Sequence, residues 1–406
     1  MTARIKVLSL IDAMPYDGDS NRVLQLATNI DRERYDFQVA TLRPPDPVFD
    51  DRYGSIRHLY REANIEILDL GERRGQPFAD SGWRRNLRRA KLLLVDVART
   101  VRLVRSGKFD LIDGHPGPPY LCGAIAGVIC GVPSVTTTYN VREEWTPRAI
   151  WAAFHQFTLA VSGAIVTDSE AVANDVRKWM LRKGHPRILV IPNGPPPPVP
   201  VRGDAEVRAQ FGLKPREQTR VVSQIATHLP GKGQHLLVDA APAILAKHPD
   251  VTFLLVGFER ADHLGYTQTL RDRAAALGVG DRMVIAPYQG HIGDVWQVVD
   301  YHVHPTMLDS LPNCVLEGMS LGKPAVVSAC AGIPTMVLDG RTGIVIPVND
   351  VPALSAAIIR LLDDAELART FGAAARERYL SGYTAQMLAS RMQTLFETLV
   401  ARKRNR

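Results

Sequence analysis

The stretch that decides the fold is His304–Met319, which reads HPTMLDSLPNCVLEGM. The residues that lead into it, Tyr301–His304, have the short pattern of a strand. Pro305–Asn313 carries the prolines, serine and asparagine that are typical of a loop. Val315–Leu321 has apolar residues at helical spacing, which predicts a helix after the loop. The backbone amides at the start of this helix then face the same side as the end of the strand.

Two carboxylates bracket the start of this predicted helix, Asp309 in the loop and Glu317 one turn or more inside the helix. The free N–H groups of a helix N-terminus bind anions. A carboxylate repels phosphate, so neither acid is expected to hold a phosphate group itself. Two hydrogen-bond acceptors next to an amide-rich anion site suit a ligand with both phosphates and hydroxyls. That description fits a nucleotide sugar.

Length and composition indicate a globular protein of two domains. The chain has 406 residues, of which 46 % are hydrophobic and 22 % are charged. Met1–Arg4 leads directly into a strand-like run, so we expect no secretory signal. The most apolar run, Leu121–Val132, falls short of the roughly 20 residues that span a bilayer.

The spacing of the cysteines and the net charge limit which cellular compartment and which kinds of partner are expected. The four cysteines have neither zinc-type nor redox spacing, which favours buried thiols in the cytoplasm. They are Cys122, Cys130, Cys314 and Cys330. The net charge of +7 suggests an anionic partner without distinguishing a nucleotide, a phospholipid or a nucleic acid.

Short apolar runs alternate with longer amphipathic segments along the whole chain, which predicts parallel strands with crossover helices. In the first half the expected strands are Ile5–Ile11, Phe37–Leu42, Leu111–Asp113, Ser134–Thr138, Ala164–Asp168 and Ile188–Ile191. In the second half they are Val221–Ile225, Thr252–Val256, Met283–Ile285, Tyr301–His304, Ala325–Ser328 and Gly343–Ile346.

The proline-rich run Pro192–Pro200 continues neither a strand nor a helix, so we place the domain linker there. We expect a first Rossmann-like domain at 1–195, a second at 196–382 and a terminal helix at 383–406. The predicted fold class is therefore α/β, with two doubly wound domains that face a cleft. Ligands of such sheets bind beyond the carboxyl ends of the strands.

Several loops that follow predicted strands carry suitable chemistry. Gly18 permits close approach of a ligand, and Ser20 or Asn21 is expected to cap the next helix, although an ordinary turn explains this loop equally well. His115 lies on a proline-rich loop, where a lone histidine is more often structural. Lys232 stands between two glycines at a helix start, which favours a phosphate clamp. Gly257, after another predicted strand, is only weak evidence of a ligand site by itself, because a plain strand-to-helix turn explains it as well.

The segment Asp309–Val327 resembles the signature of the retaining GT-B glycosyltransferases of family 4, in which two glutamates are separated by seven residues. The resemblance extends over nearly the whole chain, and the order and spacing of its motifs are more specific than any one of them. The further matching motifs are the loop near Gly18, the His115 loop, Ser169-Glu170, Ile191–Gly194, Lys232-Gly233, Val256-Gly257 and Asp339–Gly343.

The resemblance implies a role for each matching residue. Glu317 matches the glutamate that holds the ribose of the donor, and Asp309 matches the one that contacts the transferred sugar. Lys232 matches the lysine that neutralises the leaving diphosphate, and His115 matches a histidine near the sugar. We therefore expect His115, Lys232 and Asp309 to be catalytic. The residues expected to bind the donor are Gly18, Thr227, Gly257, Leu311, Pro312, Asn313, Val315 and Glu317.

The family also implies the ligands. We expect a UDP- or GDP-sugar as co-substrate, a hydroxyl acceptor on the first domain, no cofactor, no metal and no nucleic acid. The acceptor is a glycan, a lipid-linked molecule or a small molecule. Retention of configuration requires mainly the stabilisation of negative charge on the departing diphosphate. In the family, the donor phosphate is thought to take the proton of the acceptor hydroxyl.

Three single positions and one loop depart from the family pattern, the loop being that of Gly18, which lacks the second glycine and the glutamate that the family often has there. Thr227 stands where many members have an arginine, so one of the two cations on the diphosphate is missing. Asp309 is shorter by one methylene than the usual glutamate, and Thr335 replaces a frequent glutamate. A catalytically weak relative that binds nucleotide sugar or membrane is therefore the alternative, and an epimerase or a phosphorylase of the same fold is a weaker one.

The segment 83–108 holds nine basic residues and one acidic residue, Asp96. Leu87, Ala90, Leu94, Val97, Val101 and Val104 are spaced along one helical face. This pattern is typical of a basic amphipathic helix. It is compatible with packing on a sheet and with peripheral contact to anionic lipid at the inner face of a membrane.

Overall fold

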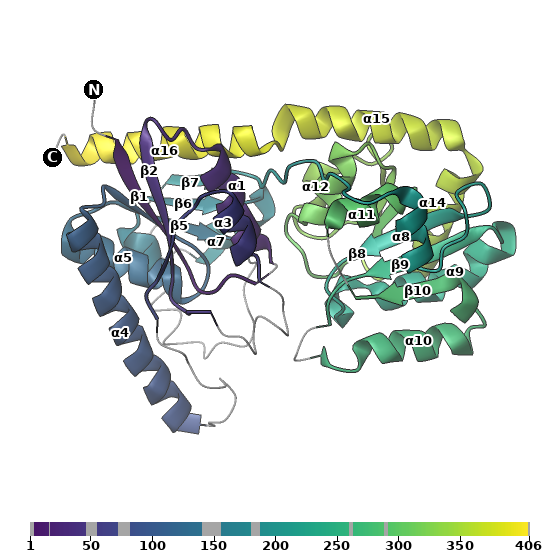
Figure 1. The fold of residues 1–406 in the computed structure, drawn as a ribbon, viewed down its shortest axis with the longest axis horizontal. Coiled ribbons are helices and arrows are strands. Elements are labelled where there is room, and N and C mark those ends of the chain that lie inside the picture. The colour runs from purple at the N-terminus through teal and green to yellow at the C-terminus, as the bar shows by residue number, and fades with distance from the viewer. Residues whose placement is uncertain are drawn as a thin grey trace. The chain divides into compact units, whose positions relative to one another are not determined.

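The computed structural model describes residues 4–15, 17–45, 55–71, 82–139, 156–179, 187–259, 263–287 and 291–404, and the side chains of 82–89 and 179 are outside this description. The chain divides into two units (Figure 1). Unit 1 comprises residues 1–194 and 385–406, and unit 2 comprises residues 195–384. Each unit is described by itself.

Unit 1 is built on a seven-stranded parallel sheet with the order β3-β2-β1-β4-β5-β6-β7. Its strands are β1 (Ile5–Ile11), β2 (Tyr35–Thr41), β3 (Ile67–Asp69), β4 (Leu111–Gly114), β5 (Ser134–Thr138), β6 (Ala164–Thr167) and β7 (Arg187–Val190). Its helices are α1 (Gly18–Asn29), α3 (Arg57–Glu62), α4 (Gly82–Gly107), α5 (Pro118–Cys130), α7 (Glu170–Trp179) and α16 (Ala385–Arg404). The short edge strand β3 was not predicted.

Helices cover both faces of this sheet. On one face, α1 and α16 pack against β1, β4, β5 and β6, and on the other face α4 and α5 pack against β1 and β4. Helix α16 buries Leu388, Met392 and Phe396 among the residues of the first face. Each such side chain contributes roughly 1.5–3 kcal/mol of burial free energy. The last helix of the chain is therefore part of the core of unit 1.

Unit 2 is built on a six-stranded parallel sheet with the order β10-β9-β8-β11-β12-β13. Its strands are β8 (Arg220–Ile225), β9 (Val251–Val256), β10 (Met283–Ala286), β11 (Tyr301–His304), β12 (Ala325–Ser328) and β13 (Ile344–Ile346). Its α-helices are α8 (Asp204–Gln210), α9 (Gln234–Lys247), α10 (Tyr266–Ala276), α11 (Ile292–Val298), α12 (Asn313–Ser320), α13 (Ile333–Met336), α14 (Val351–Asp363) and α15 (Ala365–Gly382). The described residues also include the short 3-10 helices η1 (Pro230–Lys232) and η3 (Gly280–Arg282).

Alternation along the strands explains why helices cover both faces of this sheet as well, since neighbouring residues of a strand point to opposite sides. Val222 and Phe253 pack with α9, α10 and α14, whereas Val221 and Leu254 pack with α8 and α11. The prediction of two doubly wound α/β domains is confirmed. No helix within the described ranges is long and apolar enough to cross a membrane.

Each sheet has one point at which the direction of winding reverses, and ligands of such sheets bind there. In unit 1 this point lies between β1 and β4, and in unit 2 it lies between β8 and β11. The loops after these strands carry the predicted residues Gly18 and His115 in unit 1, and Lys232 and Asp309 in unit 2. The topology thus positions both candidate sites.

Two helix starts differ from the predictions. The cap of α1 is Asp17, whose carboxylate accepts a hydrogen bond from the Ser20 amide at 2.8 Å, so the expectation of a Ser20 or Asn21 cap was wrong. Both residues lie inside the helix because it begins already at Gly18. Helix α12 begins at Asn313, two residues earlier than predicted, directly after Pro312.

Candidate active site

The loops after β8 and β11 are joined by backbone contacts. The Met307 amide donates to the Gly231 carbonyl oxygen at 2.8 Å, and the Thr306 hydroxyl donates to the same oxygen at 3.1 Å. From the strand side, Gln224 Nε2 donates to the Lys232 carbonyl oxygen at 2.6 Å. Contacts on both sides therefore hold the short helix η1 in place. They also fix the backbone position from which the Lys232 side chain extends.

Gly233 makes this close approach possible. Its φ of +73° lies in the left-handed region, and a Cβ atom would lie 2.1 Å from the Pro305 carbonyl oxygen. We expect Gly233→Ala to lower the free energy of unfolding by more than about 2 kcal/mol, because backbone strain and the clash add. Gly212→Ala is the control, since its φ is +63° but nothing lies within 4 Å of the added Cβ. Urea unfolding measures the loss of free energy of unfolding in both variants. Equal losses would contradict the view that the clash with the Pro305 carbonyl adds to the backbone strain.

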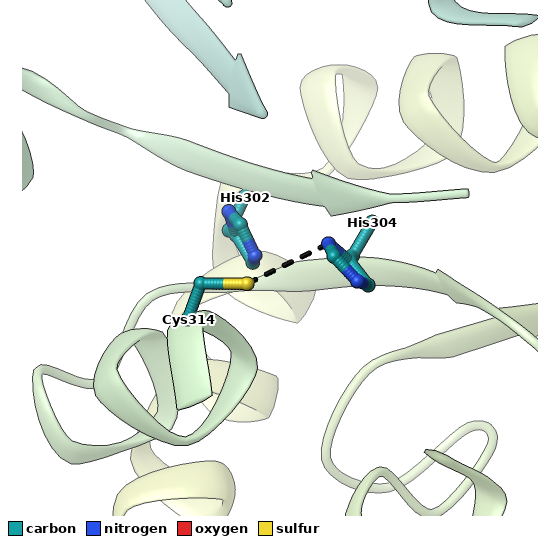
Figure 2. Close-up of side chains that lie close together, drawn as sticks. All are labelled: His302, His304 and Cys314. Atoms are coloured by element: carbon teal, nitrogen blue, oxygen red, sulfur yellow. Dashed lines mark hydrogen bonds between the residues drawn. The ribbon is translucent and has the colours of Figure 1, made fainter. Parts of the chain in front are cut away.

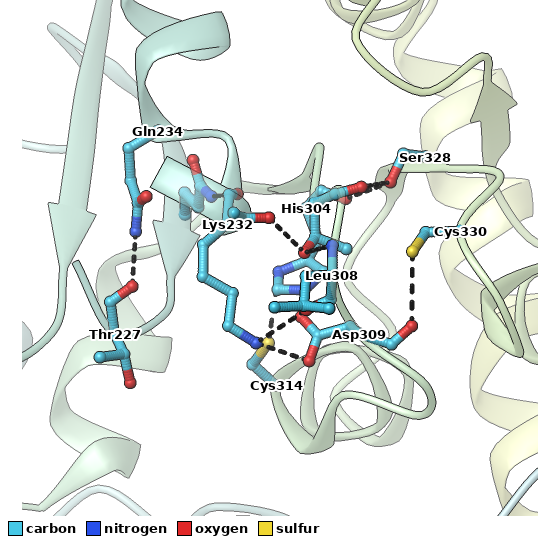
Figure 3. A network of polar contacts seen from close by, with 12 residues as sticks. Thr227, Lys232, Gln234, His304, Leu308, Asp309, Cys314, Ser328 and Cys330 are labelled. Carbon is cyan, nitrogen blue, oxygen red and sulfur yellow. Dashed lines mark hydrogen bonds and ion pairs between the residues drawn. The ribbon is translucent and has the colours of Figure 1, made fainter. Parts of the chain in front are cut away.

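A chain of polar contacts connects Lys232, Asp309 and His304 (Figure 3). Lys232 Nζ lies 2.5 Å from Asp309 Oδ1, and His304 Nε2 lies 2.8 Å from Asp309 Oδ2. Lys232 Nζ also lies 3.5 Å from the Leu308 carbonyl oxygen, and the Cys330 thiol donates to the Asp309 carbonyl oxygen at 3.5 Å. Asp309 thus bridges a lysine and a histidine.

These contacts hold Asp309 in its charged form. Burial would raise the pKa of the Asp309 carboxyl, but the Lys232 ammonium and the His304 hydrogen bond outweigh burial and keep the pKa well below its usual value. Since the carboxylate can only accept, His304 Nε2 carries the hydrogen in this contact. The side chains of Lys232 and Asp309 are 20 % and 16 % exposed, so a ligand can still reach both.

Glu317 lies on α12 in a different environment. Its Oε2 accepts a hydrogen bond from Trp296 Nε1 of α11 at 2.9 Å. Burial raises the pKa of the Glu317 carboxyl, and the Trp296 hydrogen bond opposes this rise only in part. The residue remains partly exposed, which limits the size of the shift. The pKa of Asp309 is therefore lowered, whereas the pKa of Glu317 is raised.

The residues between these acids form the start of α12. The Leu311 and Val315 side chains are buried in an apolar cluster that also holds Ile333 and Tyr379. Pro312 caps the helix through its backbone, and its carbonyl oxygen accepts from the Val315 amide at 3.1 Å. The amide of Val315, a residue expected to bind the donor, is thus already engaged within the helix.

Thr227 and Gly257 follow neighbouring strands. The Thr227 carbonyl oxygen accepts from Gln234 Nε2 at 2.9 Å, which ties the end of β8 to the start of α9. A Cβ atom on Gly257 would lie 1.8 Å from the Ala226 carbonyl oxygen, so packing of the two loops already requires a glycine there. Its role in donor binding stays a prediction.

In unit 1, His115 is buried within a network at the end of β4. His115 Nε2 lies 3.2 Å from Asp113 Oδ2, and Asp113 Oδ1 accepts from the Thr137 hydroxyl at 3.0 Å. His115 Nδ1 lies 3.1 Å from the hydroxyl of Tyr139, whose ring is 5.5 Å from the Arg22 guanidinium. Both ring nitrogens of His115 therefore have partners that fix its orientation.

Gly18 begins α1 at the end of the loop after β1. Among the described residues, nothing lies within 4 Å of the position that a Cβ atom would occupy. Unlike Gly257, this glycine is not required by packing inside its own unit.

Sequence reasoning missed several residues that shape the sites. Trp296 binds Glu317, His304 binds Asp309, and Asp113 binds His115. Asp113 stands two residues before His115, and His304 stands five residues before Asp309. Both lie at the end of an apolar strand, so a polar residue at such a position was the signal that could have identified them. Trp296 gave no signal, because a tryptophan at helical spacing is usually part of the core.

Comparison with protein families matches both halves of the chain. Residues 18–194 match the family model described as a glycosyl transferase 4-like domain. Residues 219–364 match the model described as glycosyl transferases group 1. The matched ranges contain Gly18 and His115 in the first half, and Lys232, Asp309 and Glu317 in the second.

Two curated relatives show how far the similarity extends. The D-inositol 3-phosphate glycosyltransferase of Mycobacteroides abscessus is 30 % identical over 307 residues, which cover 65 % of this chain and 68 % of that protein. An Escherichia coli protein, UDP-Gal:alpha-D-GlcNAc-diphosphoundecaprenol alpha-1,3-galactosyltransferase, is 23 % identical over 74 % of this chain and 79 % of its own length.

Among solved structures, that of Anabaena Alr3699/HepE in complex with UDP and glucose has a TM-score of 0.80. It is 21 % identical in sequence, and the match covers 97 % of this chain and 100 % of the Anabaena chain. The structure of WaaG, a glycosyltransferase involved in lipopolysaccharide biosynthesis, has a TM-score of 0.69 at 16 % identity. Together these findings show that the chain belongs to the glycosyl transferase group 1 family, the family 4 of nucleotide-sugar-dependent glycosyltransferases with the GT-B fold.

Proposed function

We propose that this enzyme transfers a sugar, with retention of configuration, from a UDP- or GDP-sugar to a hydroxyl acceptor, and that the donor binds at the carboxyl ends of β8 and β11. The observation that carries the proposal is the Lys232–Asp309 contact of 2.5 Å at the winding reversal of unit 2. A lysine and a carboxylate that are both partly exposed at this point offer one group for phosphate and one for a sugar hydroxyl.

Lys232 is the group that stabilises the leaving diphosphate. Bond breaking transfers negative charge to the diphosphate, and a fixed ammonium next to the β-phosphate lowers the energy of that state. Backbone contacts already position the lysine, so little reorganisation is needed. In the absence of donor the ammonium is neutralised by Asp309, and donor binding replaces part of this contact with phosphate.

Glu317 and Asp309 divide the recognition of the donor hydroxyls. Glu317 holds the ribose, since its partly exposed carboxylate is oriented by Trp296 and accepts from two neighbouring hydroxyls. Asp309 faces the transferred sugar, and His304 keeps the shorter side chain in place. Leu311, Pro312 and Asn313 shape the loop between these acids, and Thr227 and Gly257 border it.

The acceptor binds to unit 1, near the end of β4. His115 is oriented by Asp113 and Tyr139, which suits a ring that donates or accepts a hydrogen bond at a defined position. Gly18 leaves open space at the start of α1, which suits the close approach of a ligand. As the family implies, the donor phosphate takes the acceptor proton, so no side chain of this chain needs to act as a strong base.

A thermal-shift panel tests the donor. In a panel of UDP-, GDP- and ADP-sugars, we expect a UDP-sugar or a GDP-sugar to raise the unfolding temperature, because a ligand that binds only the folded state stabilises it by mass action. At 100 times its Kd, a ligand adds about 2.7 kcal/mol. Glu317→Ala is expected to abolish the shift. If no nucleotide sugar raises the unfolding temperature of the parent, the proposed donor site is wrong.

We further propose that α4 brings the enzyme to an anionic membrane surface. Val104 is buried and Val97 and Val101 are half-buried, so this end of the predicted apolar stripe packs on the sheet. Leu94, in contrast, is 70 % exposed. The exposed face of α4 also carries Lys91, Val95, Ala98, Arg102 and Arg105. The side chains of Arg84, Arg85, Arg88 and Arg89 lie outside the described residues.

Charge reversal tests the membrane contact. The triple variant K91E/R102E/R105E is expected to bind vesicles of phosphatidylglycerol and phosphatidylcholine at least about 10-fold more weakly, since each basic residue near such a surface contributes roughly 1 kcal/mol. K214E/K247E/R341E, which reverses three exposed charges of unit 2, is the control. Co-sedimentation measures both. If the α4 variant sediments like the parent, α4 does not bind the membrane.

A further inference from the structure

Three side chains that bind transition metals meet next to the loop that carries Asp309. They are His302 and His304 of β11 and Cys314 in the first turn of α12 (Figure 2). One ligand atom from each lies within 4.8 Å of the other two. Residues two apart on a strand share one face of the sheet, and α12 covers this face, which is why the three meet.

His302 is buried completely, and neither of its ring nitrogens makes a hydrogen bond of normal geometry among the described residues, although the Ser223 backbone lies close to the ring. The ring packs between those of Trp296 and His304, at centroid distances of 5.0 and 6.0 Å. A buried polar group without a partner costs roughly 1–3 kcal/mol. A leucine would fill the same space without this cost. A ligand that binds the ring nitrogens would explain why a histidine stands there.

His304 is oriented as a metal ligand. Its Nε2 donates to Asp309 Oδ2 at 2.8 Å, so in the neutral ring the other nitrogen, Nδ1, presents a lone pair. Nδ1 lies 3.6 Å from Cys314 Sγ. Bonds of about 2.0 Å to nitrogen and 2.3 Å to sulfur at a tetrahedral angle separate these two atoms by about 3.5 Å, which is close to the distance found. A carboxylate behind a ligating histidine is also the usual second partner of such sites.

We propose that His302, His304 and Cys314 form a binding site for one zinc-class ion. A thiolate and two imidazoles select Zn²⁺ over Mg²⁺, whose preferred ligands are oxygens. On binding, the Cys314 thiol releases its proton to solvent, and the thiolate and the ring nitrogens donate their lone pairs to the ion. The ion connects β11 to α12 and fixes His304 behind Asp309, without taking part in sugar transfer.

Cobalt titration of the chelator-treated full chain tests the site, because a thiolate bound to Co²⁺ gives a near-ultraviolet charge-transfer band. We expect this band to saturate at one equivalent and to disappear when Zn²⁺ is added. Cys314→Ser is expected to abolish the band. Cys330→Ser is the matched control, since the Cys330 thiol contacts the same loop at the Asp309 carbonyl oxygen but lies outside the cluster. The same band in C314S, or none in the parent, overturns the proposal.

A second variant separates metal binding from folding. His302→Leu removes a ligand and the unpaired nitrogens together, so we expect it to unfold at the same temperature as the parent or higher in the presence of chelator. Zn²⁺ is expected to raise the unfolding temperature of the parent by several degrees and to leave that of H302L unchanged. Equal Zn²⁺ shifts in both proteins would overturn the site. Neither readout requires a donor, so failure here is distinct from failure of the proposed sugar transfer.

Discussion

Lys232→Ala is expected to lower kcat by about 100- to 1000-fold, which is the usual cost of removing one fixed donor to a developing negative charge. We expect a large effect in this chain because Thr227 stands where the family pattern often has a second cation, which leaves Lys232 as the cation predicted to face the diphosphate. We expect the KM for the donor to rise less than kcat falls, since charge on the diphosphate grows mainly in the transition state. Steady-state kinetics with the donor identified by thermal shift measure both.

Stability separates a catalytic role of Lys232 from a structural one. Removing the ammonium leaves Asp309 charged, with His304 as the remaining side-chain partner among the described residues, which is expected to cost about 1–3 kcal/mol. The double variant Lys232→Met/Asp309→Asn removes both charges, so its free energy of unfolding should return toward that of the parent while its activity stays low. Lys214→Ala, at an exposed position of unit 2, is the control for both measurements. Recovery of activity in the double variant would show that the lysine only balances Asp309.

The architecture was predictable because every step from strand to helix has its own local pattern. Tyr301–His304 and Ala325–Ser328 were predicted to the residue, since an apolar strand between polar loops needs no long-range information. Asn313, in contrast, was predicted in the loop although it begins α12, because no side chain caps this helix.

The contacts within the site were not predictable to the same extent. Lys232 and Asp309 are 77 residues apart and meet only because β8 and β11 are neighbours in the sheet. The resemblance predicts a role for each of them, which stays a prediction, but it did not predict their ion pair. Gly257 shows the reverse, since a glycine after a strand indicates a ligand as readily as the packing against Ala226 that the structure contains.

Glu317→Gln is expected to weaken nucleotide binding by about 10- to 100-fold, because a charged acceptor to ribose hydroxyls contributes roughly 1.5–3 kcal/mol. The amide oxygen of glutamine still accepts from Trp296 Nε1, so the side chain keeps its place. Isothermal titration with UDP and GDP measures the loss. Glu217→Gln, at an exposed position of the same unit, is the control.

The same substitution is expected to stabilise the ligand-free protein at neutral pH. Because burial raises the pKa of Glu317 in the folded state, folding favours its protonated form. Below the ordinary glutamate pKa of about 4.3, both states are protonated and the variant has no advantage. As the pH rises through that value and then through the raised pKa, the folded parent must carry a partly buried charge, and the advantage of glutamine grows to its full size. A thermal-unfolding series from pH 4 to pH 8 measures how the difference in unfolding temperature between variant and parent changes with pH. If this difference falls as the pH rises, or changes equally for E317Q and E217Q, then the charge of Glu317 does not destabilise the ligand-free protein.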